Sequence, residues 1–219
     1  MKPNFVEEKK LWKKGYKKVA CLDEAGRGPL AGPVVAAAVS LNTKYKILNT
    51  KLRDSKKLTP KQREYFYKIL TSHPMIKWGI GIVSEKIIDK INIKNAAELA
   101  MEKAINNLAT KQFSNFRIDY LIIDGNHVSS SKLKTYNVKL IVKGDEKVFS
   151  CAAASILAKV TRDKIMMKYH KNYPQYGFDR HKGYGTKYHI KMLKKHGPCK
   201  IHRKSFYPVK IASGIDRDF

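Results

Sequence analysis

The sequence predicts an α/β domain built around a mixed sheet, and two observations lead to that fold class. Short apolar runs rich in β-branched residues alternate with longer segments whose apolar residues recur at helical spacing. The expected order is strand, strand, helix, strand, helix, strand, strand, helix, an alternation typical of a sheet covered by helices. No internal repeat or low-complexity linker divides the 219 residues, so we expect one domain.

The first part of the chain supplies two strands and a capped helix. The runs KKVACL and GPVVAAAVSL predict strands at 17–22 and 32–41, joined through the loop DEAGRGPLA. In TPKQREYFYKIL, Thr59 is the expected N-cap, Pro60 opens the helix and Gln62 completes a capping box. A helix should therefore begin at this point.

The rest of the chain repeats the alternation and ends in a basic region. Two of the apolar runs, DYLIIDG and VKLIVKGD, end in Asp and contain Gly, as buried strands with acids at their ends would. The small residues of SCAAASILAKV predict a helix that lies close to the sheet. The other expected strands lie at 76–84, 119–125 and 138–145, and the other expected helices at 95–109, 150–171 and 186–195.

The composition describes a strongly basic protein with an ordinary globular interior. Hydrophobic residues make up 43% of the chain, while 45 Lys and Arg against 18 Asp and Glu give a net charge of +27. Such an imbalance opposes compaction unless a polyanion accompanies the protein, so nucleic acid is the leading partner. A lysine-rich proteome, in which solvated surfaces are basic without a partner, is the alternative that composition leaves open.

The cysteines and the N-terminal sequence indicate a reducing, cytoplasmic setting. Cys21, Cys151 and Cys199 are odd in number and widely spaced, which argues against a disulfide framework or a zinc site. No apolar stretch suits a secretory signal or a membrane span. Residues 1–16 are expected to be a mobile basic extension, and residues 17–219 the single folded domain with a C-terminal helical region.

Four acids follow the predicted strands and form the first candidate site. Asp23, Asp124 and Asp145 each come after an apolar run, and Glu24 follows Asp23. If these strands are neighbours, their ends bring the carboxylates into one small volume. Asp23 and Glu24 can converge only if the chain leaves the sheet there, because consecutive strand residues face opposite ways. The alternative is that each Asp only accepts hydrogen bonds from turn amides.

A cluster of carboxylates without His or Cys favours Mg²⁺ or Mn²⁺ over zinc. Like charges a few ångströms apart raise one another's pKa, and divalent cations relieve that repulsion. Two such ions roughly 3.5 to 4 Å apart clamp a phosphodiester, and one of them generates the attacking hydroxide. The acids therefore predict a two-metal phosphodiesterase site.

Three further groups are candidate contacts to the nucleic acid. Gly26, Arg27 and Gly28 leave the backbone open to an anion or to a ribose 2′-hydroxyl, although a tight hairpin turn explains the same residues. Lys56 precedes the capped helix, and Lys143 lies two residues before Asp145. Both are candidate phosphate contacts, with solvated lysines as the alternative.

The C-terminal region contributes an aromatic residue and many basic ones. Tyr184 lies between two glycines in HKGYGTKYH, so its ring can stack on a base or sugar, with a buried core tyrosine as the alternative. The region is interpreted as a binding face, and its histidines match no compact zinc motif. Its other members are Arg180, Lys182, Arg203, His170, His181, His189, His196 and His202.

These blocks together resemble bacterial ribonuclease HII, of the type 2 ribonuclease H family. The similar segments include DEAGRGPLAGPVVAAAV, DSKKLT, LIIDGNH, KGD, AAASILAKVTRD, YPQYGFDRHKGYGT and HGPCKIHRKSF, in family order from about residue 17 to about residue 210. The resemblance implies a ribonuclease H-like fold, with a mixed five-stranded sheet flanked by helices and a small C-terminal helical part. The N-terminal extension is longer than the family core requires.

The resemblance also implies an activity and residue roles. It implies Mg²⁺- or Mn²⁺-dependent endonucleolytic cleavage of RNA in RNA/DNA hybrids and of duplex DNA on the 5′ side of an embedded ribonucleotide, leaving 3′-hydroxyl and 5′-phosphate ends. Such an enzyme would serve ribonucleotide excision from DNA and RNA primer removal. By position, Asp23, Glu24, Asp124 and Asp145 resemble the metal-binding acids, Gly26, Arg27 and Gly28 the loop that reads the 2′-hydroxyl, and Tyr184 the residue that stacks at the ribonucleotide-to-deoxyribonucleotide step.

Asp163 and the C-terminal tail also bear on the resemblance and on possible partners. Asp163 also matches a family block, but on a predicted helix we assign it to structure. The tail VKIASGIDRDF lacks the glutamine-and-aromatic pattern of relatives that grip a sliding clamp, which argues against that contact. Nothing resembles a coiled-coil seam, so we expect a monomer.

Two other functions are compatible with the sequence. A non-catalytic nucleic-acid-binding protein would use the basic face alone and would be insensitive to EDTA. A DNA-only nuclease of the same general fold, such as a resolvase or transposase, would accept an all-deoxy duplex.

Overall fold

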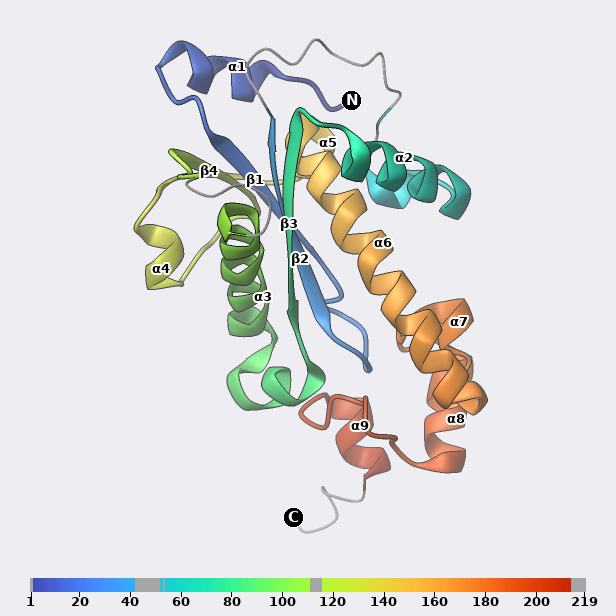
Figure 1. The fold of residues 1–219 in the computed structure, drawn as a ribbon. Coiled ribbons are helices and arrows are strands. Elements are labelled where there is room, and N and C mark those ends of the chain that lie inside the picture. The colour runs from blue at the N-terminus through green and yellow to red at the C-terminus, as the bar shows by residue number, and fades with distance from the viewer. Residues whose placement is uncertain (1, 42–51, 53, 111–115, 214–219) are drawn as a thin grey trace.

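A computed structural model describes residues 2–41, 52, 54–110 and 116–213 (Figure 1). Its centre is a five-stranded sheet in the order β3-β2-β1-β4-β5. The strands are β1 (Val19–Ala25), β2 (Val34–Leu41), β3 (Ile76–Val83), β4 (Tyr120–Asp124) and β5 (Asn137–Ile141). β2 pairs antiparallel with β1 and β3, whereas β4 pairs parallel with β1 and β5. The predicted α/β fold with a mixed five-stranded sheet is confirmed.

Helices cover both faces of the sheet and extend beyond one end of it. The short ones include two 3-10 turns, η1 (Ser55–Lys57) and η2 (Pro174–Tyr176). The helices are α1 (Val6–Lys13), α2 (Pro60–Ser72), α3 (Glu85–Thr110), α4 (Ser131–Lys134), α5 (Gly144–Lys147), α6 (Phe149–Asn172), α7 (Phe178–His181), α8 (Lys187–His196) and α9 (Tyr207–Ala212). Among the described residues, no helix is both long and apolar enough to cross a bilayer.

The two faces of β2 pack against different helices, because its side chains alternate. Ala36 and Ala38 lie in the core cluster that contains the apolar residues of α3, and Ala37 and Val39 lie in the cluster that contains those of α6 and α2. Figure 1 shows α3 on one side of the sheet and α6 on the other. Small residues on β2 therefore allow both helices to approach closely.

A glycine on β3 shows how close that approach is. A Cβ added at Gly81 would lie 1.9 Å from the carbonyl oxygen of Ala100 on α3. No side chain fits there, so the glycine is required by the packing of helix on strand. The helix itself is interrupted at Asn92, whose φ of 62° and ψ of 165° are not helical. The predicted helix at 95–109 is the part of α3 that follows this break.

The N-terminal region differs from the mobile extension that we predicted. Phe5 and Leu11 are buried, and the Phe5 ring stacks on that of Phe149 with centroids 4.4 Å apart. Glu8 is also buried, and its carboxylate accepts hydrogen bonds from the Ser150 backbone N–H (3.0 Å) and hydroxyl (2.8 Å). The apolar and acidic residues among the lysines thus form α1, which packs at the N-terminus of α6.

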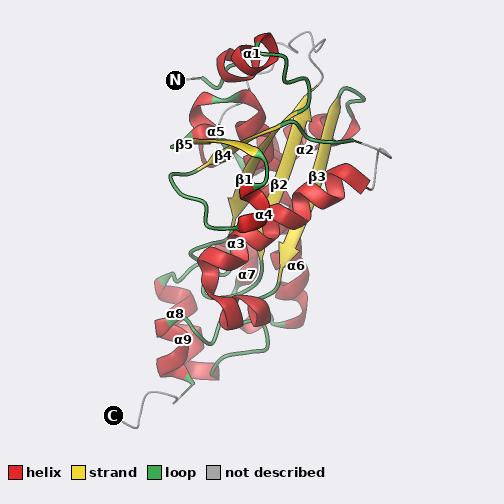
Figure 2. Ribbon diagram, turned by 90° about the vertical axis from the view of Figure 1, so that its left-hand side faces the viewer, coloured by secondary structure: helices red, strands yellow, loops and turns green. Residues whose placement is uncertain are grey.

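At the ends of two other elements, one prediction is confirmed and one differs from the structure. The capping box of Thr59 and Gln62 is present as predicted. The predicted strand at 138–145 ends at Ile141, because Lys143 adopts a left-handed conformation (φ 57°) and α5 begins at Gly144. Figure 2 shows α8 and α9 beyond one end of the sheet, at the opposite end of the molecule from α1.

Candidate active site

Three of the four predicted acids come together at the C-terminal end of β4. Asp23, Asp124 and Asp145 each offer a carboxylate oxygen, and these atoms lie within 4.8 Å of one another. Asp23 and Asp124 meet because β1 and β4 are parallel neighbours, with Leu22 opposite Ile123. Asp145 joins them from α5 rather than from the end of a strand.

The first turn of α5 fixes Asp124 in place. The backbone N–H groups of Gly144 and Asp145 donate hydrogen bonds of 2.9 Å and 3.0 Å to the two oxygens of Asp124. The left-handed backbone at Lys143 turns the chain so that these amides face β4. The same turn that ends β5 early therefore positions Asp145 beside Asp124.

The cluster is poorly suited to hold its charge without cations. Burial, followed by the charges of Glu24 and Asp124, raises the pKa of Asp23 well above its usual range. Burial and the nearby Asp124 also raise the pKa of Asp145. Oxygen ligands alone surround the cluster, and a divalent ion bound there would remove the repulsion that raises these pKa values.

Glu24 does not join the three-acid group. β1 continues through Ala25, with Glu24 paired to Ala36, so Asp23 and Glu24 face opposite sides of the sheet. The condition for their convergence, that the chain leaves the sheet at this point, is not met. Glu24 instead lines a cavity of about 240 Å³ together with Asp124 and Arg27.

Only one of the two carboxylate oxygens of Glu24 accepts a hydrogen bond from the described residues. Oε1 accepts from Arg27 Nη1 at 3.2 Å, whereas Oε2 is buried and has no hydrogen-bond partner among the described residues. An orphaned buried carboxylate oxygen is costly, and a cation in the cavity that Glu24 shares with Asp124 would satisfy it. The residues present thus fit a divalent ion on this side as well.

Two polar residues that the sequence did not indicate complete the surroundings of the acids. Asp54 is buried, and burial followed by the proximity of Asp145 raises its pKa. Ser155 on α6 lies near Asp23 and partly offsets the rise in its pKa, and the Ser155 hydroxyl lies 2.9 Å from that of Ser55. In the sequence, the small-residue face of α6 could have indicated that Ser155 faces the sheet. For Asp54, the only indication in the sequence is its position two residues before Lys56.

The two lysines predicted to contact phosphate are exposed near the acids. Lys56 Nζ lies 3.5 Å from Asp145 Oδ2, with its side chain 80% exposed. Lys143 is exposed at the N-terminus of α5. Both are therefore accessible to an anion that approaches the carboxylates.

The Gly-Arg-Gly loop and Tyr184 are neighbours in space although far apart in sequence. A Cβ added at Gly28 would lie 3.8 Å from Tyr184 Cε1. Gly26 has a φ of +99°, in the left-handed region that favours glycine. Arg27 is exposed, apart from its ion pair with Glu24. Tyr184 is 44% exposed, which contradicts the alternative of a core tyrosine.

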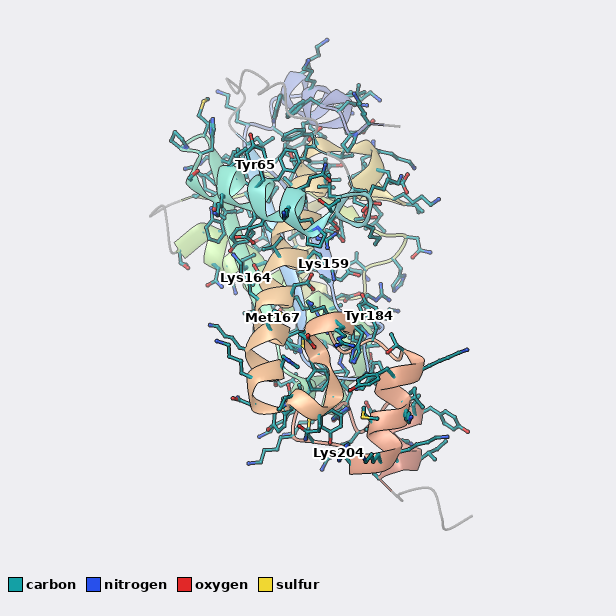
Figure 3. The ribbon with its side chains drawn as sticks, turned by 90° about the vertical axis from the view of Figure 1, so that its right-hand side faces the viewer. Tyr65, Lys159, Lys164, Met167, Tyr184 and Lys204 are labelled. Carbon is teal, nitrogen blue, oxygen red and sulfur yellow. The ribbon has the colours of Figure 1, made fainter. Side chains whose placement is uncertain are left out.

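Tyr184 lies at the rim of a broad basic groove. Lys159 Nζ and Arg162 Cζ each lie 5.9 Å from the centre of its ring. Figure 3 shows Lys159 and Lys164 on α6 above Tyr184, with Met167 beside them. The groove has a volume of about 880 Å³, and its lining includes Arg63, Lys159, Lys164, Lys168, Arg180 and Tyr184. Asp163 also lines it and pairs with Lys159 at 2.8 Å.

The predicted role of Arg203 as a substrate contact is wrong. The residue is completely buried, and its guanidinium donates to backbone carbonyls instead of facing solvent. The basic sequence around it gave no sign of this, because burial of an arginine depends on carbonyl groups contributed by distant segments.

The predicted binding face is also too large, because two of its histidines are buried. His189 and His202 face each other with their Nε2 atoms 3.0 Å apart. His189 Nδ1 lies 2.9 Å from the Tyr184 carbonyl oxygen and must donate to it, so its Nε2 accepts from His202. His202 Nδ1 in turn accepts from the Cys199 backbone N–H at 2.9 Å. This chain of neutral rings supports the loop of Tyr184.

Comparison with known proteins identifies the family and the fold of the chain. The family model for ribonuclease HII matches residues 20–209. The ribonuclease HII of Chlamydia trachomatis serovar A is 49% identical over 218 residues, which cover 96% of this chain and 95% of that protein.

Solved structures show the same fold. The crystal structure of ribonuclease H2 from Pyrococcus horikoshii aligns with a TM-score of 0.69 at 27% identity, over 92% of this chain and all of that one. Bst-RNase HIII in complex with Mn²⁺ aligns with a TM-score of 0.67 at 16% identity, over 92% and 71% of the two chains, a likeness of fold alone. With a family match over most of its length and a relative about half identical, the protein belongs to the ribonuclease HII family and is a metal-dependent ribonuclease H, an endonuclease for the RNA of RNA/DNA hybrids.

Proposed function

We propose that the enzyme cleaves RNA in hybrids and also nicks duplex DNA on the 5′ side of a single embedded ribonucleotide. The observation that supports this most directly is the adjacency of three elements: the carboxylates of Asp23, Asp124 and Asp145, the Gly-Arg-Gly loop and the exposed ring of Tyr184. Ribonucleotide excision from DNA and removal of RNA primers are the cellular roles that we propose for this activity.

The acids are the proposed metal ligands. Asp23, Asp124 and Asp145 would hold one side of the site, and Glu24 with its unpartnered Oε2 would complete it from the other. Two Mg²⁺ or Mn²⁺ ions bound there would supply a hydroxide at neutral pH and would stabilise negative charge on the phosphate. In the hydrolysis itself the P–O3′ bond breaks, which leaves a 3′-hydroxyl and a 5′-phosphate.

The loop of Gly26, Arg27 and Gly28 is proposed to read the ribose. Without side chains, Gly26 and Gly28 leave backbone groups open to a 2′-hydroxyl, the group that distinguishes RNA from DNA. Arg27 is exposed and tied to Glu24, so it links the loop to the proposed metal ligands. The loop and the catalytic acids are thus parts of one continuous surface.

Tyr184 and two lysines are proposed to hold the rest of the substrate. The Tyr184 ring would stack on the sugar that follows the ribonucleotide, because it is exposed beside Gly28. Lys56 and Lys143 would contact phosphates next to the acids. A correct junction would then place the scissile phosphate against the metal ligands.

The test is a mapped nick on defined duplexes. Purified protein is incubated with a DNA duplex that bears one ribonucleotide and with the same duplex in all-deoxy form, with Mg²⁺, with Mn²⁺ or with EDTA. We expect one cut 5′ of the ribonucleotide that needs a divalent ion and no cut in the all-deoxy duplex. Cleavage of the all-deoxy duplex would contradict the proposed recognition of the ribose, and cleavage in EDTA would contradict the proposed use of metal.

A further inference from the structure

Two arginines are buried in the protein without a carboxylate partner. Arg162 on α6 is 1% exposed, and Arg203, between α8 and α9, is 0% exposed. Neither forms an ion pair with any of the residues that the structure describes. A buried guanidinium needs hydrogen-bond acceptors, and in most proteins carboxylates supply them. Here backbone carbonyl groups do so.

Arg162 connects the chain after the Gly-Arg-Gly loop to the loop of Tyr184. Its Nε donates to the Pro33 carbonyl at 2.9 Å and its Nη2 to the Ala31 carbonyl at 3.1 Å. Its Nη1 donates to the Lys182 carbonyl at 2.9 Å, two residues before Tyr184. A single planar group thus joins two segments that are far apart in sequence.

Arg203 holds the Gly-Arg-Gly loop itself. Its Nη2 and Nη1 donate to the carbonyls of Gly26 (2.6 Å) and Arg27 (2.9 Å), and its Nε donates to that of Gly32 (2.9 Å). Its backbone N–H also donates to the Leu30 carbonyl at 2.8 Å. Side chain and backbone of one residue therefore fix both ends of the loop.

The two segments have no space in which to slide past each other. The Leu30 N–H donates to the Gly183 carbonyl at 2.8 Å, and a Cβ added at Gly183 would lie 2.6 Å from the Ala31 carbonyl oxygen. On the other side, a Cβ at Gly26 would lie 2.1 Å from Arg162 Nε. Any shift of one segment against the other breaks hydrogen bonds or creates a clash.

We propose that Arg162 and Arg203 are positioning residues that set the register between the Gly-Arg-Gly loop and Tyr184, and thereby the junction that the enzyme accepts. The inference rests on the proposed roles of that loop and of Tyr184. A ribose and the sugar that follows it are linked by one phosphate, so two elements that read them must keep a fixed separation. The guanidinium suits this task, because its five N–H donors lie in one rigid plane, whereas lysine offers a single flexible ammonium group.

The experiment compares Arg162→Lys and Arg203→Lys with the wild type on two substrates. One is a duplex with a single ribonucleotide, and the other is a hybrid with a long RNA tract. The measured quantity is the ratio of kcat/KM on the first to kcat/KM on the second. We expect each variant to lower this ratio by about tenfold or more, since small misplacements at a reacting centre cost up to about 100-fold. The Mg²⁺ concentration at half-maximal rate should change by less than about twofold.

A matched control separates positioning from loss of stability. Leu108→Ala removes a buried side chain from α3, where the residue lies over Gly79 of β3, away from both segments. It should lower the melting temperature without changing the ratio. If either lysine variant fails to fold, Gly183→Ala displaces the same two segments without touching an arginine and should lower the ratio by a similar factor.

Double variants decide whether the arginines act through the recognition elements. Arg162→Lys in a Tyr184→Ala background, and Arg203→Lys in an Arg27→Ala background, should lower the ratio no further than the background does. Two outcomes would show that the positioning role is wrong while the proposed function stands. In the first, Tyr184→Ala and Arg27→Ala lower the ratio but the lysine variants leave it unchanged. In the second, the fold-reductions caused by the lysine variant and by its background multiply in the double variant. If Tyr184→Ala and Arg27→Ala themselves leave it unchanged, the proposed recognition fails and this inference fails with it.

Discussion

The backbone N–H of Asp145 donates a 3.0 Å hydrogen bond to the carboxylate of Asp124, so the two acids are fixed by a direct contact. Asp124 has no freedom to turn away from the cluster, because Gly144 holds its other oxygen. Two of the proposed metal ligands are therefore held side by side by hydrogen bonds of the fold itself, and electrostatic repulsion between the acids opposes that arrangement.

Asp124→Asn should abolish metal-dependent cleavage while binding of the hybrid changes little. The amide removes one negative ligand from the cluster and places an NH₂ group where both oxygens now accept hydrogen bonds. We expect the cleavage rate to fall by about a thousandfold or more, the equivalent of about 4 kcal/mol of transition-state stabilisation. Gel-based cleavage and fluorescence anisotropy measure the two effects.

The control for this variant is Glu102→Gln on α3, whose carboxylate binds Ser130 and lies 3.7 Å from Lys132. It should cleave at close to the wild-type rate. Substantial turnover by Asp124→Asn at saturating Mg²⁺ would contradict the proposed site.

Asp23→Asn should stabilise the metal-free protein at neutral pH. The raised pKa means that folded Asp23 holds its proton more tightly than the unfolded chain does. Its ionisation at pH 7 therefore costs folding free energy, whereas below the unfolded pKa of about 4 that cost disappears. Denaturant unfolding in EDTA at pH 7 should show a higher free energy of unfolding for Asp23→Asn than for the wild type.

With saturating Mg²⁺ the wild type should be the more stable of the two proteins, because it gains stability from the bound ion and the Asp23→Asn variant gains little. A variant that is less stable than the wild type in EDTA would show that repulsion among the acids is not the dominant effect.

The buried histidine pair should make the protein less stable as the pH falls from about 6.5 to about 4. Burial lowers the pKa of His189 and of His202 to about 4. An unfolded histidine binds a proton near pH 6.5, so within this window protons favour the unfolded chain. Each ring contributes a slope of up to about 1.4 kcal/mol per pH unit.

His202→Gln should flatten this dependence relative to the wild type, because one of the two buried rings is gone. His196→Gln, at the exposed end of α8, should keep the wild-type slope. The readout is the free energy of unfolding measured in urea at several pH values. If the free energy of unfolding falls with pH in parallel for the wild type, His202→Gln and His196→Gln, the histidine pair is not the cause of the pH dependence.

Tyr184→Ala should weaken recognition of single ribonucleotides more than hydrolysis of long RNA tracts. Loss of a stacked ring costs about 1–3 kcal/mol, which corresponds to a fall in kcat/KM of about five- to 160-fold on the single-ribonucleotide duplex. Tyr188→Ala is a matched control, since Tyr188 is 46% exposed against 44% for Tyr184 and lies four residues away. Equal losses on both substrates would count against a role at the junction.

The sequence predicted those features that depend on short segments. The five strands and the capping box of Thr59 and Gln62 are local patterns and are present, and Asp124 ends β4 as predicted. Asp145, by contrast, lies on α5 and not at the end of a strand. The convergence of Asp23 with Asp124 was predictable as well, because it needs only that two apolar strands be neighbours.

The features that the sequence missed depend on distant contacts. Asp54 and Ser155 lie next to the acids only because η1 and α6 pack together. Arg203 appeared to be a surface residue because its acceptors, the carbonyls of Gly26, Arg27 and Gly32, carry no sequence signal. Asp23 and Glu24 were expected to converge only if the chain left the sheet, but both lie in β1, so Glu24 approaches the site from the opposite side of the sheet.

The order of the parts along the chain has a consequence for protein synthesis. All five strands and all four acids precede residue 146, whereas Tyr184 and Arg203 come near the C-terminus. Since ribosomes extend chains from the N-terminus, the four acids of a nascent polypeptide are synthesised before Tyr184 and Arg203. A chain truncated by premature termination after α6 would therefore retain the carboxylates and Arg162 but lose Tyr184 and the contacts of Arg203 with the Gly-Arg-Gly loop.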